Sequence, residues 1–139
     1  MKSSLIQRVH ASVLIFLGIA LAVTTTISQR TGTGLYPWLH ENPMAHGGLI
    51  QAYLLMAVVG TAYWVGISGQ GPGWKWDVVG IIAHFPPVIG LLMYWNLFAT
   101  VGSANIPYIS LTLHGFWVAL EVFAIVEIVR SRPSQPTRL

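Results

Sequence analysis

The sequence has no cysteine and very few charged residues. Its 139 residues include 4 Asp or Glu and 7 Lys or Arg, so that only 8% of the side chains are charged. The absence of cysteine excludes disulfide bonds, thiolate metal sites and cysteine nucleophiles. A soluble domain carries about 25% charged residues. Together with a hydrophobic content of 54%, the low charge indicates a membrane protein.

The few charges are mostly basic, which gives a net charge of +3. The basic residues are scattered along the chain rather than clustered on one face, so we do not expect nucleic acid as a partner. The sequence also contains no glycine-rich phosphate loop, zinc signature or nucleophile elbow. The composition therefore indicates the lipid bilayer as a partner of the chain.

Four apolar segments have the length of about 20 residues that a membrane-spanning helix needs. Only helices and closed barrels satisfy their backbone hydrogen bonds in lipid, and segments of this length are helices. We therefore predict an all-α, four-helix transmembrane bundle of up-down-up-down order, with a transmembrane domain at 1–130 and a cytoplasmic tail at 131–139. The predicted spans are 9–28, 44–67, 77–99 and 108–130.

The first segment also has features of a signal peptide. Residues 1–8 are basic, an apolar stretch follows, and Ala20-Leu21-Ala22 resembles a cleavage site. We treat the segment as the first membrane span.

Lysine and arginine predict the orientation, because cytoplasmic loops are enriched in them. Arg30 alone falls on one side of the predicted bundle. Both termini are therefore expected in the cytoplasm, and the protein is expected in a prokaryotic cytoplasmic membrane. The basic residues on the other side are Lys2, Arg8, Lys75, Arg130, Arg132 and Arg138.

Each predicted span contains one histidine, while His40 lies in a loop. From the rise of 1.5 Å per residue, His46 and His114 are expected at similar depth near the outer face, and His10 and His84 near the inner face. Helices two and four are diagonal in such a bundle, as are helices one and three. Two diagonal histidines at one depth could ligate a haem iron. We expect one haem b at His46 and His114, and a second is possible at His10 and His84.

Each of these histidines also has a structural interpretation. His10 is close enough to a helix end to meet lipid headgroups. His84 precedes Pro86-Pro87, which remove backbone hydrogen bonds, and its ring could bond a freed carbonyl. His114 is the least ambiguous, because an ionisable residue well inside a span is a functional candidate by default.

Glycines accompany the expected outer pair. Gly47 and Gly48 follow His46, and Gly115 follows His114. Glycine would allow a flat macrocycle to approach the backbone, although small residues also allow helices to pack closely in lipid. Tyr53 continues the stripe of His46 at heptad spacing.

Two stretches resemble parts of a known family. "HGGLIQAYLLMAVVGTAYWVG" is similar to the second helix of the large subunit of haem-copper oxidases, nitric oxide reductases in particular, where a histidine ligates the low-spin haem b. "SLTLHGFWVAL" is similar to the helix with the other low-spin ligand, with His114 in that position and Thr112 where the family has a further histidine. The resemblance covers about a third of the chain.

This resemblance implies a six-coordinate haem b that carries electrons, with other membrane redox subunits or further copies of the chain, and a quinol or a cytochrome c, as partners. The family's catalytic metal needs histidines that this chain lacks, so we do not expect oxygen or nitric oxide reduction by the chain alone. An electron-transfer subunit is therefore a better expectation than a complete enzyme.

Glu121 is the remaining candidate. It is expected near the middle of the fourth span, where a charge costs on the order of 3 kcal/mol. It could relay protons or accept a hydrogen bond from a quinol; alternatively, it is a protonated acid bonded to a threonine, Gln51 or Asn96. A small transporter that uses Glu121, or an accessory subunit that only packs in a complex, are the alternative functions. Asp77 is expected to open the third helix as a cap or first-turn acid.

Overall fold

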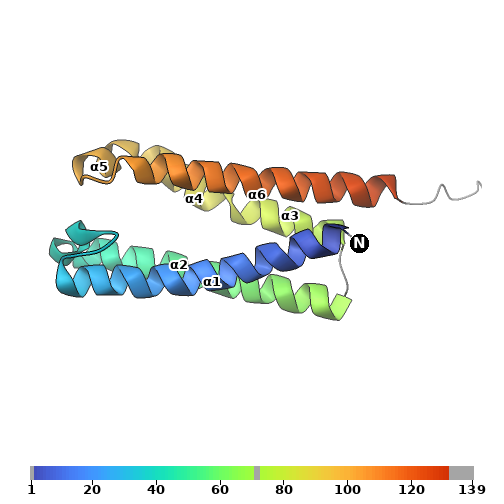
Figure 1. The fold of residues 1–139 in the computed structure, drawn as a ribbon, viewed down its shortest axis with the longest axis horizontal. Helices are drawn as coiled ribbons and strands as arrows, with labels where there is room; N and C mark the ends of the chain where they lie inside the picture. The colour runs from blue at the N-terminus through green and yellow to red at the C-terminus, as the bar shows by residue number, and fades with distance from the viewer. Residues whose placement is uncertain (1, 71–72, 132–139) are drawn as a thin grey trace, which may run out of the picture.

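The computed structural model describes residues 2–70 and 73–131, and every element in these ranges is a helix (Figure 1). A hairpin of two long helices lies beside a second group of helices, of which α6 is the longest. In chain order the elements are α1 (Lys2–Thr31), the 3₁₀ helix η1 (Pro37–Glu41), α2 (Pro43–Gln70), α3 (Trp74–Ala83), α4 (Phe85–Met93), α5 (Trp95–Thr100) and α6 (Asn105–Arg130).

Four stretches of the described chain are long and apolar enough to cross a membrane, which confirms the expected class of fold. Their bounds are Ser4–Thr31, Pro43–Gly69, Trp74–Met93 and Asn105–Arg130. Large apolar side chains point outward along them, for example Phe16 and Leu55, which are 71% and 62% exposed. Such surfaces suit contact with lipid tails. The predicted tail at 131–139 lies almost wholly outside the described residues.

The third span differs from the continuous helix expected at 77–99. The helix breaks at His84 and again at Tyr94, and the apolar stretch long enough to span ends at Met93. Pro86 and Pro87 explain the first break, because proline has no backbone N–H and its ring clashes with the preceding turn. They occupy the first turn of α4, where the missing N–H groups cost least.

Glycines bring the two helices of the hairpin together. A Cβ added at Gly60 of α2 would lie 2.9 Å from the Ala11 oxygen and 2.9 Å from the Ile15 nitrogen of α1. A Cβ added at Gly18 of α1 would lie 2.6 Å from the Tyr53 oxygen of α2. The hairpin therefore uses small residues to pack helix on helix, as membrane proteins do.

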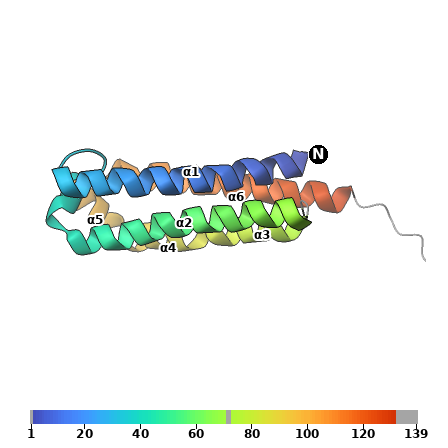
Figure 2. The ribbon, with the colours of Figure 1, turned by 90° about the horizontal axis from the view of Figure 1, so that it is seen from below.

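The two groups of helices are packed most closely at one end of the molecule. We call it the N-terminal end, because α1 starts there; α3 starts and α6 ends at the same end (Figures 1 and 2). α3 contacts α1, α2 and α6 there, and α1 contacts α6. A core of Ala11, Leu14, Tyr63 and Ile67 lies between them.

The opposite end, which holds η1 and α5, is packed differently. η1 covers the end of the α1–α2 hairpin and buries Leu39. α5 packs on α6 and buries none of its side chains, while α4 buries only Leu91. The contacts that fix the two groups against each other therefore lie near the N-terminal end.

Candidate functional site

Seven polar side chains gather between the helices in the half of the bundle nearest the N-terminal end. Four helices and the α3–α4 break contribute to this group, which we call the polar cluster. Six of its members are at most 3% exposed and His114 is half-buried. Its members are Gln7 and His10 of α1, Tyr63 of α2, Asp77 of α3, His84 at the break, and His114 and Glu121 of α6.

Helical spacing explains why these residues meet. His114 and Glu121 are seven residues apart on α6, as are Asp77 and His84 on the third span, while Gln7 and His10 are three apart on α1. Residues at these spacings lie on one face of a helix. Each helix therefore presents its polar residues along a single stripe, and the stripes face one another.

Three imidazoles form a hydrogen-bonded row across the bundle. His114 Nδ1 lies 2.8 Å from His84 Nδ1, and His84 Nε2 lies 3.2 Å from His10 Nε2. The remaining nitrogen of His10, Nδ1, contacts Glu121 Oε1. Both nitrogens of His84 and of His10 are thus engaged, and the row continues without interruption from His114 to a carboxyl group.

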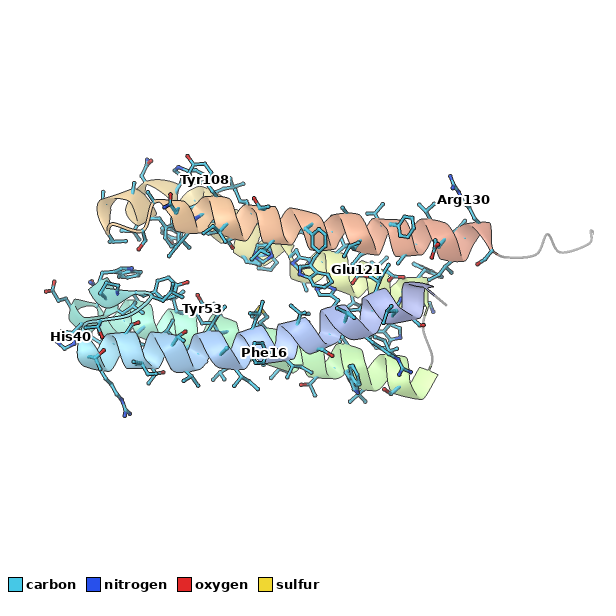
Figure 3. All side chains as sticks on the ribbon, in the orientation of Figure 1. Phe16, His40, Tyr53, Tyr108, Glu121 and Arg130 are labelled. Atoms are coloured by element: carbon cyan, nitrogen blue, oxygen red, sulfur yellow. The ribbon has the colours of Figure 1, made fainter. Side chains whose placement is uncertain are left out.

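Glu121 is the point where this row meets the other helices. The Tyr63 hydroxyl donates to its two oxygens at 3.0 and 3.1 Å. Gly80 of α3 leaves room for the carboxyl group, since an added Cβ would lie 2.9 Å from Oε1. Figure 3 labels Glu121 on the side of α6 that faces α1 and α3.

Asp77 and Gln7 extend the cluster toward the N-terminal end. Gln7 Nε2 donates to Asp77 Oδ1 at 2.7 Å and to the Gly73 carbonyl at 3.2 Å. Asp77 lies close enough to Glu121 and His10 to interact with both electrostatically. The expected role of Asp77 as only a first-turn acid was therefore incomplete, because its side chain is fully buried in the cluster.

Aromatic rings enclose the cluster and hold its members in place. Trp117 stacks on His10 with ring centres 4.5 Å apart and planes at 9°. Trp76 lies against Tyr63 at 6.1 Å and 27°. The apolar faces of these rings lower the local dielectric constant, which strengthens the hydrogen bonds of the cluster and makes an unpaired polar group costly.

The structure does not bring His46 and His114 together. His46 Nε2 lies 3.4 Å from the Thr26 hydroxyl of α1. His114 instead contacts His84, which in turn contacts His10 of α1. Thr26 and His10 are 16 residues apart, which is a rise of about 24 Å along α1. The similar depth expected for His46 and His114 was therefore wrong, because helix bounds alone do not determine how far neighbouring helices are shifted along one another.

His10 and His84, in contrast, are neighbours. Their Nε2 atoms face each other at 3.2 Å and their ring planes differ by only 7°. Two metal–nitrogen bonds of about 2.0 Å on opposite sides of an ion would need about 4 Å between these atoms. Both rings are also buried by protein. As placed, they bond each other, and the described residues contain no group of three or more metal-ligating side chains arranged around one ion.

The other residues expected near a haem have separate surroundings. Among the described residues, added Cβ atoms at Gly47, Gly48 and Gly115 would meet nothing within 4 Å, so these glycines are not needed for close packing there. The Tyr53 hydroxyl bonds that of Tyr36 at 2.9 Å. Burial raises the pKa of the Tyr36 phenol above its ordinary value, and the bond to Tyr53 acts in the opposite sense.

Two further expectations concern side chains outside the row. Gln51 and Asn96, which were expected to be able to bond Glu121, are exposed, and the partners of Glu121 are His10 and Tyr63 instead. His40 is exposed and bonds the Gln29 carbonyl at 2.8 Å. The heptad and i, i+3 spacing of polar residues in three of the four spans was the signal that could have identified the cluster.

The described residues thus form helices only, with four apolar stretches long enough to cross a membrane and a buried polar cluster between them. Comparison with family models, curated proteins and solved structures gives no match. The function must therefore be inferred from the cluster itself.

Proposed function

We propose that the chain conducts protons within the membrane through a relay formed by His114, His84, His10 and Glu121. The observation that carries the proposal is the unbroken row of contacts among these four side chains. Ionisable groups inside a membrane span are costly, and chains of histidine and carboxyl groups there mark proton pathways. Imidazole suits the task because its two nitrogens exchange donor and acceptor roles close to neutral pH.

The row can hold its protons in two opposite orders. In the first, His114 Nδ1 donates to His84, His84 Nε2 donates to His10, and His10 Nδ1 donates to the Glu121 carboxylate. In the second, protonated Glu121 donates to His10 Nδ1, His10 Nε2 donates to His84, and His84 Nδ1 donates to His114. When protonated Glu121 passes its proton to His10 and each ring passes one on, His114 releases its proton from Nε2, and the second order becomes the first. Every intermediate imidazole stays neutral overall.

The relay covers part of the bundle rather than its full length. Glu121 and His114 are seven residues apart on α6, which is about 10 Å along the helix. We infer an up-down order of the four spans with both termini in the cytoplasm, in agreement with the lysine and arginine distribution. The relay then leads from the cytoplasmic side to the middle of the membrane.

A flux measurement in vesicles tests the relay. Purified protein is reconstituted into liposomes that contain a pH-sensitive dye, and proton uptake is driven by a potassium diffusion potential. The His84→Phe variant keeps a ring of similar size but removes both nitrogens from the centre of the row. We expect it to lose the protein-dependent flux and to keep the helical content of the parent chain.

His40→Phe is the matched control, because His40 is exposed and lies outside the relay. It should conduct like the parent chain. Wild-type vesicles no more permeable than empty ones would overturn the function, and an active His84→Phe variant would overturn the relay.

Haem b electron transfer is a second proposal, and it depends on a different observation. His10 and His84 of the described chain already face each other with nearly parallel rings. A haem would supply one-electron redox chemistry. However, the 3.2 Å separation and the complete burial of both rings do not fit a macrocycle between them, and His46 and His114 lie too far apart. We therefore assign no iron ligand from the structure.

A reduced-minus-oxidised absorption spectrum of the purified protein tests this proposal. A bis-histidine haem b would give a sharp reduced α-band that is lost in His46→Ala and His114→Ala for the outer pair, or in His84→Ala for the inner pair. Absence of the band, or its survival in all three variants, would contradict haem ligation by these residues. Partner redox subunits, a quinol or a cytochrome c belong to the same proposal.

A further inference from the structure

Two buried oxygen atoms of the polar cluster are not satisfied by any group of the described residues. Asp77 Oδ2 and Gln7 Oε1 have no hydrogen-bond partner among the described residues, although both side chains are 0% exposed. An unpaired buried polar atom destabilises a folded protein. Both atoms are acceptors, and they belong to side chains that bond each other at 2.7 Å through Gln7 Nε2 and Asp77 Oδ1.

The position of this pair is as informative as its chemistry. Gln7 also bonds the carbonyl of Gly73, the residue directly before α3, so the pair lies at the N-terminal end of the cluster. On its other side Asp77 interacts with Glu121, where the relay begins. Asp77 thus stands between the end of the bundle and the first carboxyl group of the relay.

We propose that Asp77 and Gln7 form the port through which the relay exchanges protons with water at the N-terminal end. One water molecule has two O–H donors, which matches the two free acceptors, and buried waters commonly bond such groups. A hydronium ion at this position transfers one proton to Asp77 Oδ2 and becomes water. Asp77 then passes that proton to Glu121, so that no charge is created or lost. The inference rests on the proposed relay function.

The surroundings of Asp77 support transfer toward Glu121. Titratable groups that face the two carboxyl groups are His10 from α1 and Tyr63 from α2. Two carboxylates this close in a buried site repel each other unless a proton lies between them. The facing Asp77 and Glu121 therefore suit the transfer of a single proton, while Gln7 holds Asp77 in place.

Asp77→Asn separates proton transfer from structure. Asparagine keeps an oxygen that can accept from Gln7 Nε2, but it cannot carry a proton at neutral pH. In the liposome assay we expect proton uptake at least tenfold slower than in the parent chain, with unchanged helical content. Glu127→Gln is the matched control, because Glu127 is the next acid along α6 and lies outside the cluster; its flux should be that of the parent chain.

Chemical rescue distinguishes a port from a merely structural residue. Formate, a small weak acid, should restore uptake in Asp77→Asn by delivering protons directly to Glu121, after subtraction of the rate in empty vesicles with formate. It should not restore uptake in His84→Phe, where the relay itself is cut.

The possible results separate the two proposals. Parental flux in Asp77→Asn overturns the port but leaves the relay. Loss of flux that formate does not restore also overturns the port, because Asp77 then acts through structure. Absence of flux in the wild-type chain overturns the relay and the port together.

Discussion

A single methyl group at position 80 should disturb proton transfer without replacement of any titratable residue. Gly80 of α3 packs directly on the Glu121 carboxyl group, and a Cβ there would lie 2.9 Å from Oε1 and 3.0 Å from the carboxyl carbon. Ordinary contacts of this kind are 3.4 Å or longer. In Gly80→Ala the carboxyl group must therefore move by about 0.5 Å.

This movement is large compared with the tolerance of the bonds that Glu121 makes. Its bonds to Tyr63 are 3.0 and 3.1 Å long, and a hydrogen bond lengthened by about 0.5 Å loses most of its strength. A hydrogen bond to a charged group contributes about 1.5–3 kcal/mol, which corresponds to a factor of about 10 to 100 in rate if it is lost from the transfer step. We expect Gly80→Ala to slow proton uptake within this range.

The liposome flux assay measures the effect, with Gly90→Ala as the matched control. Gly90 lies in the same span, and an added Cβ there would meet nothing within 4 Å. Both variants gain the same methyl group and the same helix propensity. Equal flux in the two variants, with both folded, would refute the placement of Glu121 against α3.

Three further predictions concern the fold. Gly60→Ala should destabilise the α1–α2 hairpin by about 1–3 kcal/mol relative to Gly48→Ala, because only the methyl group at position 60 would meet the neighbouring backbone. Reversible unfolding in mixed detergent measures the difference. Equal stabilities of the two variants would contradict the close approach of α1 and α2. Burial raises the pKa of Tyr36, so this phenol ionises at lower pH in the unfolded chain than in the folded one. The contribution of Tyr36 to stability should be constant below a pH of about 10 and fall above it. Tyr36→Phe should reduce that fall in an alkaline titration of unfolding. The chain has no cysteine of its own, so single cysteines can be placed at Thr33 and at Ser131. They should react with an impermeant thiol reagent from opposite sides of the membrane. Labelling of both from one side would contradict the proposed topology.

Much of the fold could be predicted from sequence, because length and apolar composition alone determine membrane spans. The same reasoning missed the break at Tyr94, for which nothing in the sequence gives a cause, although Pro86 and Pro87 indicated the break at His84. Helix bounds also do not determine how far neighbouring helices are shifted along one another. His114 was therefore expected near the depth of His46, while the structure places it beside His84.

The candidate site was only partly predictable for a related reason. Glu121, His10, His84 and His114 were all identified as unusual for a membrane span, since composition shows this directly. Their partners depend on which helices are neighbours and on how each helix is rotated, which one sequence does not specify. Asp77 was assigned only a helix-end role and Gln7 was overlooked, because each lies close to a helix end, where polar residues have an ordinary structural role.

The uneven packing of the two ends has a consequence for local unfolding. α4, α5 and the first part of α6 bury few side chains, whereas α1, α2 and α3 share a core near the N-terminal end. Regions with few buried contacts open at a lower free energy than the rest of a protein. Backbone amides of α5 should therefore exchange with solvent deuterium well before those of the Tyr63 turn, and opening events that begin at α5 can leave the polar cluster intact.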